Sequence, residues 1–144
     1  MFMGEFRHNL DQKGRIIIPS KFRSELGGSF IVTRGMDGCL FVYSQLSWDS
    51  LVKKLSSLPL TKKDSRAFSR FFYSGATEVE IDKQGRINLP QNLISFAKLE
   101  KECIVLGVNS RVEIWDADTY QKVDSEMADN ISEISENLMD IDFD

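Results

Sequence analysis

Apolar and polar residues alternate in two short stretches of the chain that lie 71 residues apart. In residues 5–10 the inward face consists of Phe6, His8 and Leu10, and residues 78–81 repeat the pattern. Strict alternation over several residues is typical of a β-strand that buries one face. The pattern therefore predicts a strand in each stretch, with polar side chains on the opposite face.

Each predicted strand is followed by the same motif, Asp-x-x-Gly-Arg-Ile-x-x-Pro, at residues 11–19 and again at residues 82–90. An aspartate can bond its own backbone two residues further on, and glycine accepts a positive φ, so the first four residues predict a tight turn. The residues after the arginine predict a second strand, and the proline suits the start of a helix. Such an internal repeat determines the architecture, because it means that one unit occurs twice.

Both copies continue in the same order, with a short helix, a hairpin and a longer helix. The hairpins cover residues 30–43 and 104–115. In the first copy, Ser44 or Ser47 is expected to cap a helix whose apolar residues recur at helical spacing. In the second copy, Asp116 takes the capping position.

A further helix is predicted between the two copies, in residues 58–75. Phe68, Phe71 and Phe72 form an apolar stripe on it. Its basic side chains are Lys62, Lys63, Arg66 and Arg70. Two interpretations remain open: a basic face beside DNA, or a core-packing helix with a solvated charged face, which we favour.

The C-terminal segment from Asp124 to Asp144 contains eight acidic residues and no lysine or arginine. Its apolar residues, which we call the tail seam, step by four and three positions: Met127, Ile131, Ile134, Leu138 and Ile141. This spacing predicts an amphipathic helix with a narrow apolar stripe. The tail seam must bury against this chain or a neighbouring one. The acidic face should lie away from any DNA, because phosphates would repel it.

Composition restricts the class of protein. With 144 residues, of which 42% are hydrophobic and 28% charged, the chain is expected to form one compact unit or two small halves. No apolar run is long enough to cross a bilayer, and the first residues lack the pattern of a secretion signal. We therefore expect a cytoplasmic protein without a membrane partner. Cys39 and Cys103 have no metal ligands nearby in sequence and are expected to be buried as small apolar residues.

Charge is distributed unevenly along the chain. The net charge of −4 arises from 12 Lys and Arg against 6 Asp and Glu in residues 1–75, and from 6 against 16 in residues 76–144. A basic first half and an acidic second half indicate a nucleic-acid partner for the basic part, or head-to-tail packing of subunits.

The sequence carries no signature of an enzyme. We find no nucleophile paired with a base, no spacing of metal ligands and no phosphate-binding loop. His8 is the only histidine, and its position on the inward face of a strand favours a core or rim residue over a catalytic one. We therefore expect no enzymatic activity, no cofactor, no metal and no small-molecule substrate.

The repeated Asp-x-x-x-Arg motif, with Gly before the arginine and Pro four residues after it, resembles the MraZ family of bacterial transcriptional regulators. The resemblance extends over nearly the whole chain, including the Met-Phe-x-Gly start and residues 58–76. A single Gly-Arg-Ile run also resembles AbrB-type regulators, but two copies in one chain are more specific. The resemblance implies an α+β, mostly β fold. It consists of two tandem AbrB-like modules with swapped-hairpin topology and a pseudo-twofold internal repeat.

On this basis we divide the chain into four parts. The first AbrB-like DNA-binding module covers residues 5–47, and the second AbrB-like module covers residues 76–119. A helical connector occupies residues 48–75, and an acidic C-terminal amphipathic helix occupies residues 120–144.

The resemblance also implies a function. The chain would be a sequence-specific DNA-binding regulator that acts on G-rich direct repeats in double-stranded DNA upstream of its own operon, in the division and cell-wall gene cluster. It would form a ring-shaped homo-oligomer and associate with the nucleoid. The alternative is an oligomeric protein-interaction scaffold that docks through its acidic helix. Salt separates the two, because it weakens phosphate contacts far more than apolar docking.

The motif residues carried over from the family are Asp11 with Arg15, and Asp82 with Arg86. Arginine can hold a phosphate or read a guanine through two hydrogen bonds, which lysine cannot copy. The expected DNA-binding residues are Arg7, Lys13, Gly14, Arg15, Lys21, Arg23, Lys83 and Arg86, with Asp11, Asp82 and Gly85 as turn residues. Gln84 replaces Lys13 in the second copy, so it is open whether both copies contact DNA equally.

A second hypothesis concerns assembly. The outward face of the first strand is basic at Arg7, whereas the matching face in the second copy is acidic at Glu78 and Glu80. Similar modules with opposite charge favour a head-to-tail contact that closes into a ring or continues as a filament. Ile17 points away from the inward face. It is expected in this contact, or else is a singly exposed apolar residue, which is common.

Overall fold

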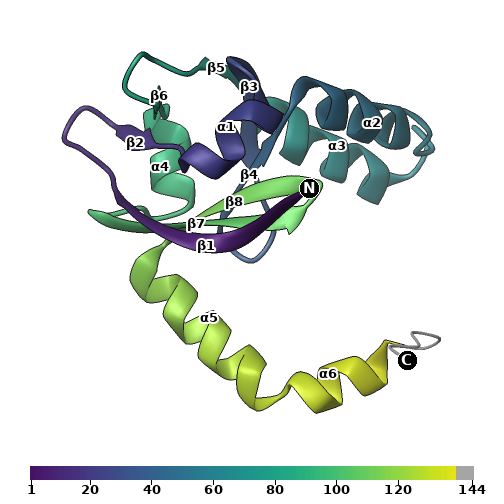
Figure 1. Cartoon of the computed structure of the whole chain (residues 1–144). Helices are drawn as coiled ribbons and strands as arrows, with labels where there is room; N and C mark the ends of the chain where they lie inside the picture. The colour runs from purple at the N-terminus through teal and green to yellow at the C-terminus, as the bar shows by residue number, and fades with distance from the viewer. Residues whose placement is uncertain (139–144) are drawn as a thin grey trace.

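The structure, a computed structural model, describes residues 1–138 of the chain (Figure 1). In chain order its elements are β1 (Phe2–Asn9), β2 (Arg15–Ile17), α1 (Ser20–Leu26), β3 (Ser29–Arg34), β4 (Leu40–Tyr43), α2 (Gln45–Ser56), α3 (Lys63–Gly75), β5 (Thr77–Glu80), β6 (Arg86–Asn88), α4 (Gln91–Phe96), β7 (Glu102–Asn109), β8 (Arg111–Asp116), α5 (Ala117–Asp129) and α6 (Ile131–Asn137). The acidic-tail residues Asp140, Ile141, Asp142 and Asp144 lie outside the described residues.

Six strands form one antiparallel sheet in the order β1-β7-β8-β4-β3-β5. The first strand of each repeat pairs with the third strand of the other repeat, β1 with β7 and β5 with β3. Exchanging the two repeats reverses the strand order without changing any neighbour, which places a pseudo-twofold axis between β4 and β8. The expected α+β fold with swapped hairpins and an internal twofold repeat is confirmed. The module boundaries at residues 5–47 and 76–119 stay a prediction.

The second strand of each repeat forms a separate ribbon, in which β2 pairs with β6. Ile16 lies opposite Ile87 at the centre of this ribbon, and both side chains are almost fully buried. Neighbouring residues on a strand point to opposite faces, so the residues on either side of the two isoleucines face outward. We call this outer surface the ribbon face; it consists of Arg15, Ile17, Arg86 and Asn88.

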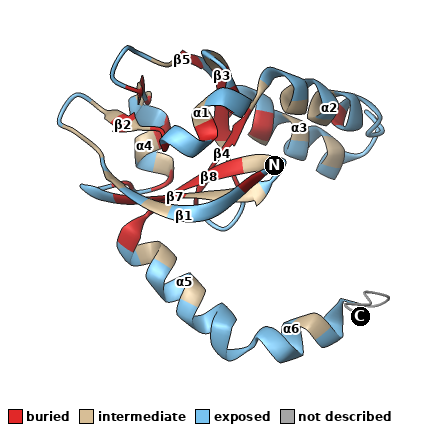
Figure 2. Cartoon of the chain, viewed as in Figure 1, coloured by how far each residue is buried: buried red, intermediate tan, exposed pale blue. Residues whose placement is uncertain are grey.

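The central strands of the large sheet consist mostly of buried residues (Figure 2), and a separate cluster of buried side chains lies on each of its faces. One face packs against the β2–β6 ribbon and the short helices α1 and α4, in a core that includes Phe22 and Phe30. The other face packs against α2, α3 and α5, around Phe72 and Trp115. The ribbon and the three longest helices therefore lie on opposite sides of the sheet.

The local predictions for strands and caps agree with the structure. The inward residues of β1 at positions 6 and 8 are half-buried, and their polar neighbours are exposed. Of the two candidate caps for α2, Ser44 is the one used, because its side chain accepts a hydrogen bond from the backbone N–H of Ser47. Asp116 caps α5 through the N–H of Thr119, as expected.

The connector helix α3 packs into the core. Phe72 is only 2% exposed, whereas the basic side chains of the helix are exposed. The hydroxyl of Thr33 donates to the carbonyl of Phe72 at 2.7 Å, and Arg34 donates through Nε and Nη2 to the carbonyl of Phe71 at 3.0 and 2.8 Å. The core-packing interpretation of this segment is confirmed.

The C-terminal tail differs from the prediction. It begins at Ala117 and forms two helices that are separated at Asn130, where φ is −111° and ψ is 10°. The side chain of Asn130 donates to the carbonyl of Glu126 at 2.8 Å, which competes with the regular helical bonding. A single continuous helix is therefore wrong. Both helices project from the body (Figure 1), and the described part of the tail seam stays 38–51% exposed.

Two further sequence-based expectations concern the cysteines and membrane spans. Cys39 and Cys103 are buried free thiols, as expected, and burial raises the pKa of Cys103 to about 12. A buried thiol that stays protonated packs as a small apolar side chain. Across the part of the chain that the structure describes, no helix combines the length and the apolar character needed to span a bilayer.

Candidate nucleic-acid interface

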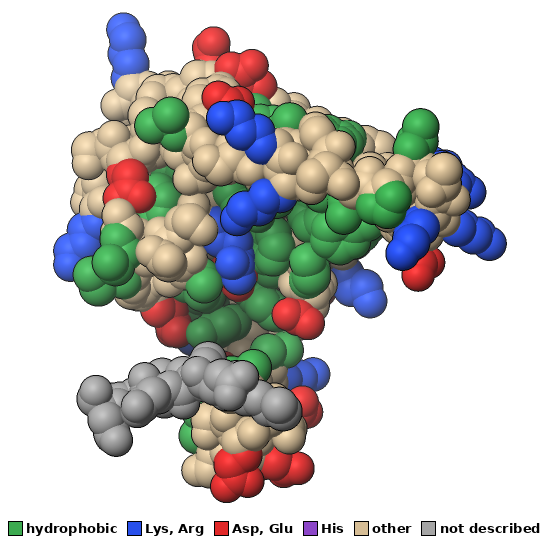
Figure 3. All heavy atoms as spheres, turned by 90° about the vertical axis from the view of Figure 1, so that its right-hand side faces the viewer, with side chains coloured by type: hydrophobic (Ala, Val, Ile, Leu, Met, Phe, Trp, Pro, Cys, Tyr) green, Lys and Arg blue, Asp and Glu red, His purple; other side chains and the backbone are tan. Residues whose placement is uncertain are grey.

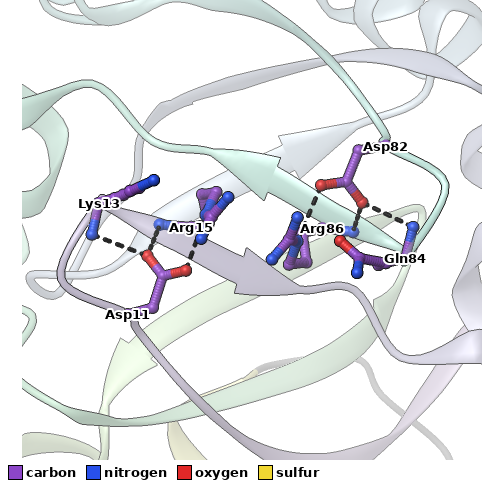
Figure 4. Close-up of polar contacts among 6 residues, drawn as sticks. All are labelled: Asp11, Lys13, Arg15, Asp82, Gln84 and Arg86. Atoms are coloured by element: carbon purple, nitrogen blue, oxygen red, sulfur yellow. Dashed lines mark hydrogen bonds and ion pairs between the residues drawn. The ribbon is translucent and has the colours of Figure 1, made fainter.

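The first Asp–Arg turn is held together by a single carboxylate (Figure 4). Oδ1 of Asp11 accepts hydrogen bonds from the backbone N–H groups of Lys13 and Arg15, both at 2.9 Å. Oδ2 accepts a hydrogen bond from Nε of Arg15 at 2.7 Å. The carboxylate therefore fixes the backbone of the turn and the direction of the guanidinium at the same time.

The second turn repeats this geometry. Oδ1 of Asp82 accepts hydrogen bonds from the N–H groups of Gln84 and Arg86 at 2.9 Å each, and Oδ2 accepts one from Nε of Arg86 at 2.8 Å. Figure 4 shows the two pairs on the same side of the β2–β6 ribbon, with the aspartates toward its opposite ends. One surface thus carries two guanidinium groups that the pseudo-twofold repeat relates to each other.

The glycine of each turn has a conformational role. Gly14 and Gly85 both have a φ of +79°, a value that L side chains rarely adopt. The carbonyl of Gly14 accepts a hydrogen bond from the N–H of Leu89, and that of Gly85 accepts one from Ile18, both at 2.8 Å. Each turn is therefore anchored to a backbone segment of the other repeat.

The hydrogen bonds of the turns lower the pKa of both aspartates. For each carboxylate the largest contribution comes from the backbone N–H of the motif arginine, and partial burial acts against it. Asp11 and Asp82 are therefore fully charged near neutral pH. Each carboxylate balances the charge of the guanidinium beside it, so any excess positive charge at a turn must come from its neighbours.

The two motif arginines are held in place and yet remain accessible. The side chain of Arg15 is 30% exposed and that of Arg86 is 26% exposed. Within residues 1–138, the aspartate is the only hydrogen-bond partner of each guanidinium. The terminal Nη groups are therefore available to an external acceptor, and two of their N–H bonds can match a phosphate or the O6 and N7 atoms of guanine.

Strand exchange brings a different neighbour to each turn. A Cβ atom on Gly14 would lie 3.2 Å from Cδ1 of Ile94, whereas one on Gly85 would lie 2.3 Å from the guanidinium of Arg23. Arg23 in α1 and Ile94 in α4 are equivalent positions of the repeat, 71 residues apart. The second turn therefore has a positive charge beside it that comes from the first repeat. Within the second turn itself, Gln84 stands where the first turn has Lys13.

The structure distributes the other expected lysines between the turns and α1. Lys13 is exposed in the first turn, and Lys83 is exposed in the second turn, near Arg23 and Asp82. Lys21 is exposed on α1, with its Nζ atom 6.0 Å from the centre of the Phe6 ring. These cations flank the Asp–Arg pairs without forming part of them.

Arg7 does not join this surface. On β1 it lies opposite Ile104, which belongs to the core beneath the long helices. Strand alternation therefore puts Arg7 on the sheet face away from the β2–β6 ribbon, where it forms an exposed ion pair with Glu102 at 3.4 Å. The expected cationic edge is corrected accordingly: of its three members, the structure brings together only Lys13 and Arg15.

The residues expected at a subunit interface also lie in different places. Ile17 is part of the ribbon face. Glu78 and Glu80 lie on the edge strand β5, where Glu78 accepts hydrogen bonds from the hydroxyl of Ser29 at 2.6 Å and from the amide of Gln45 at 3.2 Å. The fold therefore does not place these three residues in a single contact.

Sequence reasoning misses Asn88, which lies on the ribbon face opposite Arg15. Its amide can both donate and accept hydrogen bonds, as contacts to base edges require. Strand alternation could have found it, because Asn88 follows Arg86 by two residues and so shares its face.

His8 has the environment of a core or rim residue, as expected. It is half-buried, and burial together with the nearby charge of Arg23 lowers its pKa, so the ring is neutral at pH 7. Residues 1–138 contain no cluster of three or more side chains suited to holding a metal ion.

The fold and the site define a protein of two interlaced repeats that presents paired Asp–Arg turns as a candidate nucleic-acid interface. Comparisons with known proteins give its family. The sequence model described as "MraZ protein, putative antitoxin-like" matches twice, at residues 1–71 and 72–142. The chain is 59% identical over 142 residues to the Transcriptional regulator MraZ of Ligilactobacillus salivarius (strain UCC118), covering 99% of each. It is 59% identical over 143 residues to the Transcriptional regulator MraZ of Limosilactobacillus reuteri (strain DSM 20016), covering 99% of this chain and 100% of that protein. The chain belongs to the MraZ family.

Proposed function

We propose that this chain is a transcriptional regulator that binds double-stranded DNA through the ribbon face and the two Asp–Arg turns. The names of its relatives support a role in transcription rather than in catalysis. The observation that carries the DNA-binding proposal is the pair of accessible arginines, each held through Nε by a carboxylate, on one surface.

Arg15 and Arg86 would supply the sequence-specific contacts. Because Nε is already bonded to the aspartate, the guanidinium loses less conformational freedom when its Nη groups meet a base. A bidentate contact from arginine to guanine O6 and N7 is worth about 1–3 kcal/mol of discrimination against another base. This chemistry suits the G-rich sites that the family resemblance implies.

Phosphate contacts would come from the cations that flank the turns. Lys13 would contact phosphate at the first turn, and Lys83 and Arg23 would do so at the second. Lys21 extends the basic surface along α1. Such contacts fix the position of a protein on the duplex and carry little sequence information. Both turns are therefore proposed to contact DNA, with phosphate partners that differ between them.

This difference between the turns favours direct repeats over a palindrome as the target. A protein with true twofold symmetry reads a palindromic site, whereas the two turns here present unequal neighbours. Several chains in one orientation would each contact one repeat, and their combined binding would gain from effective concentration. We place these repeats upstream of the chain's own operon, in the division and cell-wall gene cluster, which also implies association with the nucleoid.

A ring of identical subunits is the proposed arrangement, and the edges of the sheet offer a contact for it. β1 and β5 are opposite edge strands, and exposed edges pair readily with other chains. Arg7 gives the first edge a positive side chain, and Glu78 with Glu80 gives the second edge negative ones. Contacts between unlike surfaces repeat around a closed ring. Ile17, on the ribbon face, is assigned to the DNA side instead.

A gel shift over a salt series tests the DNA-binding proposal. The probe is duplex DNA from directly upstream of the gene, and the competitor is the same duplex with its repeats scrambled. We expect retention of the intact probe, loss of the complex as salt rises, and much weaker binding by the Arg15→Ala variant. A folded Arg15→Ala variant that binds as the wild type does would remove Arg15 from the interface.

The alternative function, a scaffold that docks other proteins through its acidic helix, is favoured by the exposed tail seam. Docking on an apolar surface should persist when salt is added, whereas phosphate binding should weaken steeply. If the wild-type chain does not bind the upstream duplex at low salt, the scaffold function is favoured over DNA binding.

A further inference from the structure

We propose that the tail seam of one subunit docks into the groove between helices α2 and α3 of a second copy of the same chain. This contact rests on the proposed homo-oligomer and specifies one interface within it. It involves neither the ribbon face nor the Asp–Arg turns, so it can fail while the DNA-binding proposal holds.

The groove is an open surface cavity of about 840 Å³ between the end of α2 and α3. Its lining includes Leu55, Leu58, Leu60, Arg66, Arg70 and Tyr73. Leu58, Leu60 and Tyr73 are 37%, 80% and 41% exposed and line the same groove, so they form one apolar patch rather than scattered single residues. The groove thus combines an apolar floor with guanidinium groups.

The described part of the tail seam lies on two consecutive helices, with Met127 on α5, Ile131 and Ile134 on α6, and Leu138 at the C-cap of α6. Met127, Ile131, Ile134 and Leu138 recur at steps of four, three and four residues. A helix that lies in an apolar groove uses anchors at this spacing. The bend at Asn130 divides the face between α5 and α6, so the two short helices can follow a curved surface.

Within residues 1–138, neither surface is covered by another part of the chain. The large hydrophobic side chains that are exposed in residues 1–138 number thirteen, and eight of them lie on these two surfaces or next to them. The eight are Leu58, Leu60, Tyr73, Val123, Met127, Ile131, Ile134 and Leu138. In Figure 1 the tail leaves the body on a different side from α2 and α3, and Figure 3 shows hydrophobic side chains gathered on the face of the body above the tail.

Charge makes the two surfaces complementary. Residues 58–75 carry Lys62, Lys63, Arg66 and Arg70 with Asp64 as their only acidic residue, whereas from Val123 onward the tail has acidic residues and no cation. Opposite charges around an apolar contact set its orientation and suppress the pairing of like surfaces. A tail therefore fits a connector, and two tails or two connectors repel each other.

The internal repeat explains why the same chain carries both surfaces. Helices α2 and α3 follow β4 in the first repeat as α5 and α6 follow β8 in the second. The first pair folds back against itself and the sheet, and the second pair extends from the body (Figure 1). Because the contact joins unlike surfaces, every subunit can give a tail and receive one, which closes into a ring.

Sedimentation velocity of the full chain at micromolar concentration tests this contact with single variants. Leu60→Asp in the groove and Ile134→Asp on the tail are expected to shift the assembly to smaller species. Leu46→Asp is the matched control, because Leu46 is 81% exposed on α2 and does not line the groove. Circular dichroism confirms that each variant is folded.

A charge exchange tests which surfaces meet. Arg66→Glu with Arg70→Glu should weaken assembly, as should Glu133→Arg with Glu136→Arg, and a chain that combines all four should recover it. Failure of the combined chain to recover, a monomeric wild type, or groove and tail variants that assemble as the wild type does would each overturn the contact. A short duplex with one repeat should still bind every variant, which separates this outcome from failure of the DNA-binding proposal.

Discussion

The guanidinium of Arg23 lies against Gly85, in the turn of the opposite repeat, and its Nε atom donates to the carbonyl of Ile18 at 2.8 Å. Helix α1 of the first repeat therefore completes the second turn. Ile94 takes the equivalent place at Gly14, so two turns with the same Asp–Arg geometry differ in charge. Whether a turn has a charged or an apolar neighbour therefore depends on the other repeat.

Removing the charge of Arg23 should weaken DNA binding through the second turn. We expect Arg23→Ala to lower affinity for all sequences alike and to make the slope of log affinity against log salt shallower by about one, as for the loss of one phosphate contact. Lys53→Ala, on the exposed side of α2, is the control and should keep the wild-type slope. An unchanged slope for Arg23→Ala would place this cation outside the interface.

The turn glycines should be intolerant of side chains. Gly14→Ala and Gly85→Ala force a residue with a Cβ atom to a φ of +79°, which costs about 1–2 kcal/mol of folding free energy. Gly28→Ala is the matched control, because its φ is ordinary and nothing lies within 4 Å of an added Cβ. Chemical denaturation measures all three. Equal stability of Gly14→Ala and Gly28→Ala would contradict the conformational role.

The central pair of the ribbon should be critical for stability. Ile16 is 0% exposed and Ile87 is 1% exposed, so Ile16→Ala leaves a cavity and should lower the free energy of unfolding by about 2–5 kcal/mol. Ile17→Ala, one residue further along the same strand but on the ribbon face, should cost much less. Similar losses for the two variants, measured by urea denaturation, would show that the ribbon is not oriented as described.

Acid should destabilise the turns through Asp11 and Asp82. Both carboxyl groups have a pKa below their ordinary 3.8 in the folded chain, so the unfolded chain binds protons first as the pH falls. Their stabilising contribution is complete above the unfolded pKa and is lost as the pH falls through the lowered folded values.

The double variant Asp11→Asn, Asp82→Asn tests this linkage, because it cannot undergo the titration. Its stability deficit relative to the wild type should shrink between pH 6 and pH 2.5, as roughly the range that spans these pKa values. Urea denaturation at a series of pH values gives the deficit directly. A deficit that stays constant over this range would show that the two carboxylates do not contribute as charged groups.

The turns and strand faces within one repeat were predictable from the sequence, whereas the contacts between the two repeats were not. The turn at Asp11 follows from four residues whose bonds stay within the turn, and the inward face of β1 follows from alternation. The placement of Arg23 and of Arg7 depends on strand exchange, which no spacing within one repeat encodes. The break at Asn130 was missed because its apolar period continues across it.

Affinity measured by fluorescence anisotropy tests the central claim most directly. The proteins are the wild type, Arg15→Ala, Arg86→Ala, the double variant and Lys53→Ala, each titrated against a duplex with the repeated sites and a scrambled duplex at one salt concentration. We predict that each single motif variant loses roughly tenfold or more on the repeated sites, since one bidentate base contact is worth about 1–3 kcal/mol.

The double variant should bind the two duplexes equally weakly, and Lys53→Ala, on the exposed side of α2, should bind as the wild type does. A folded double variant that retains wild-type preference for the repeated sites would contradict the assignment of the Asp–Arg turns as the surface that reads DNA.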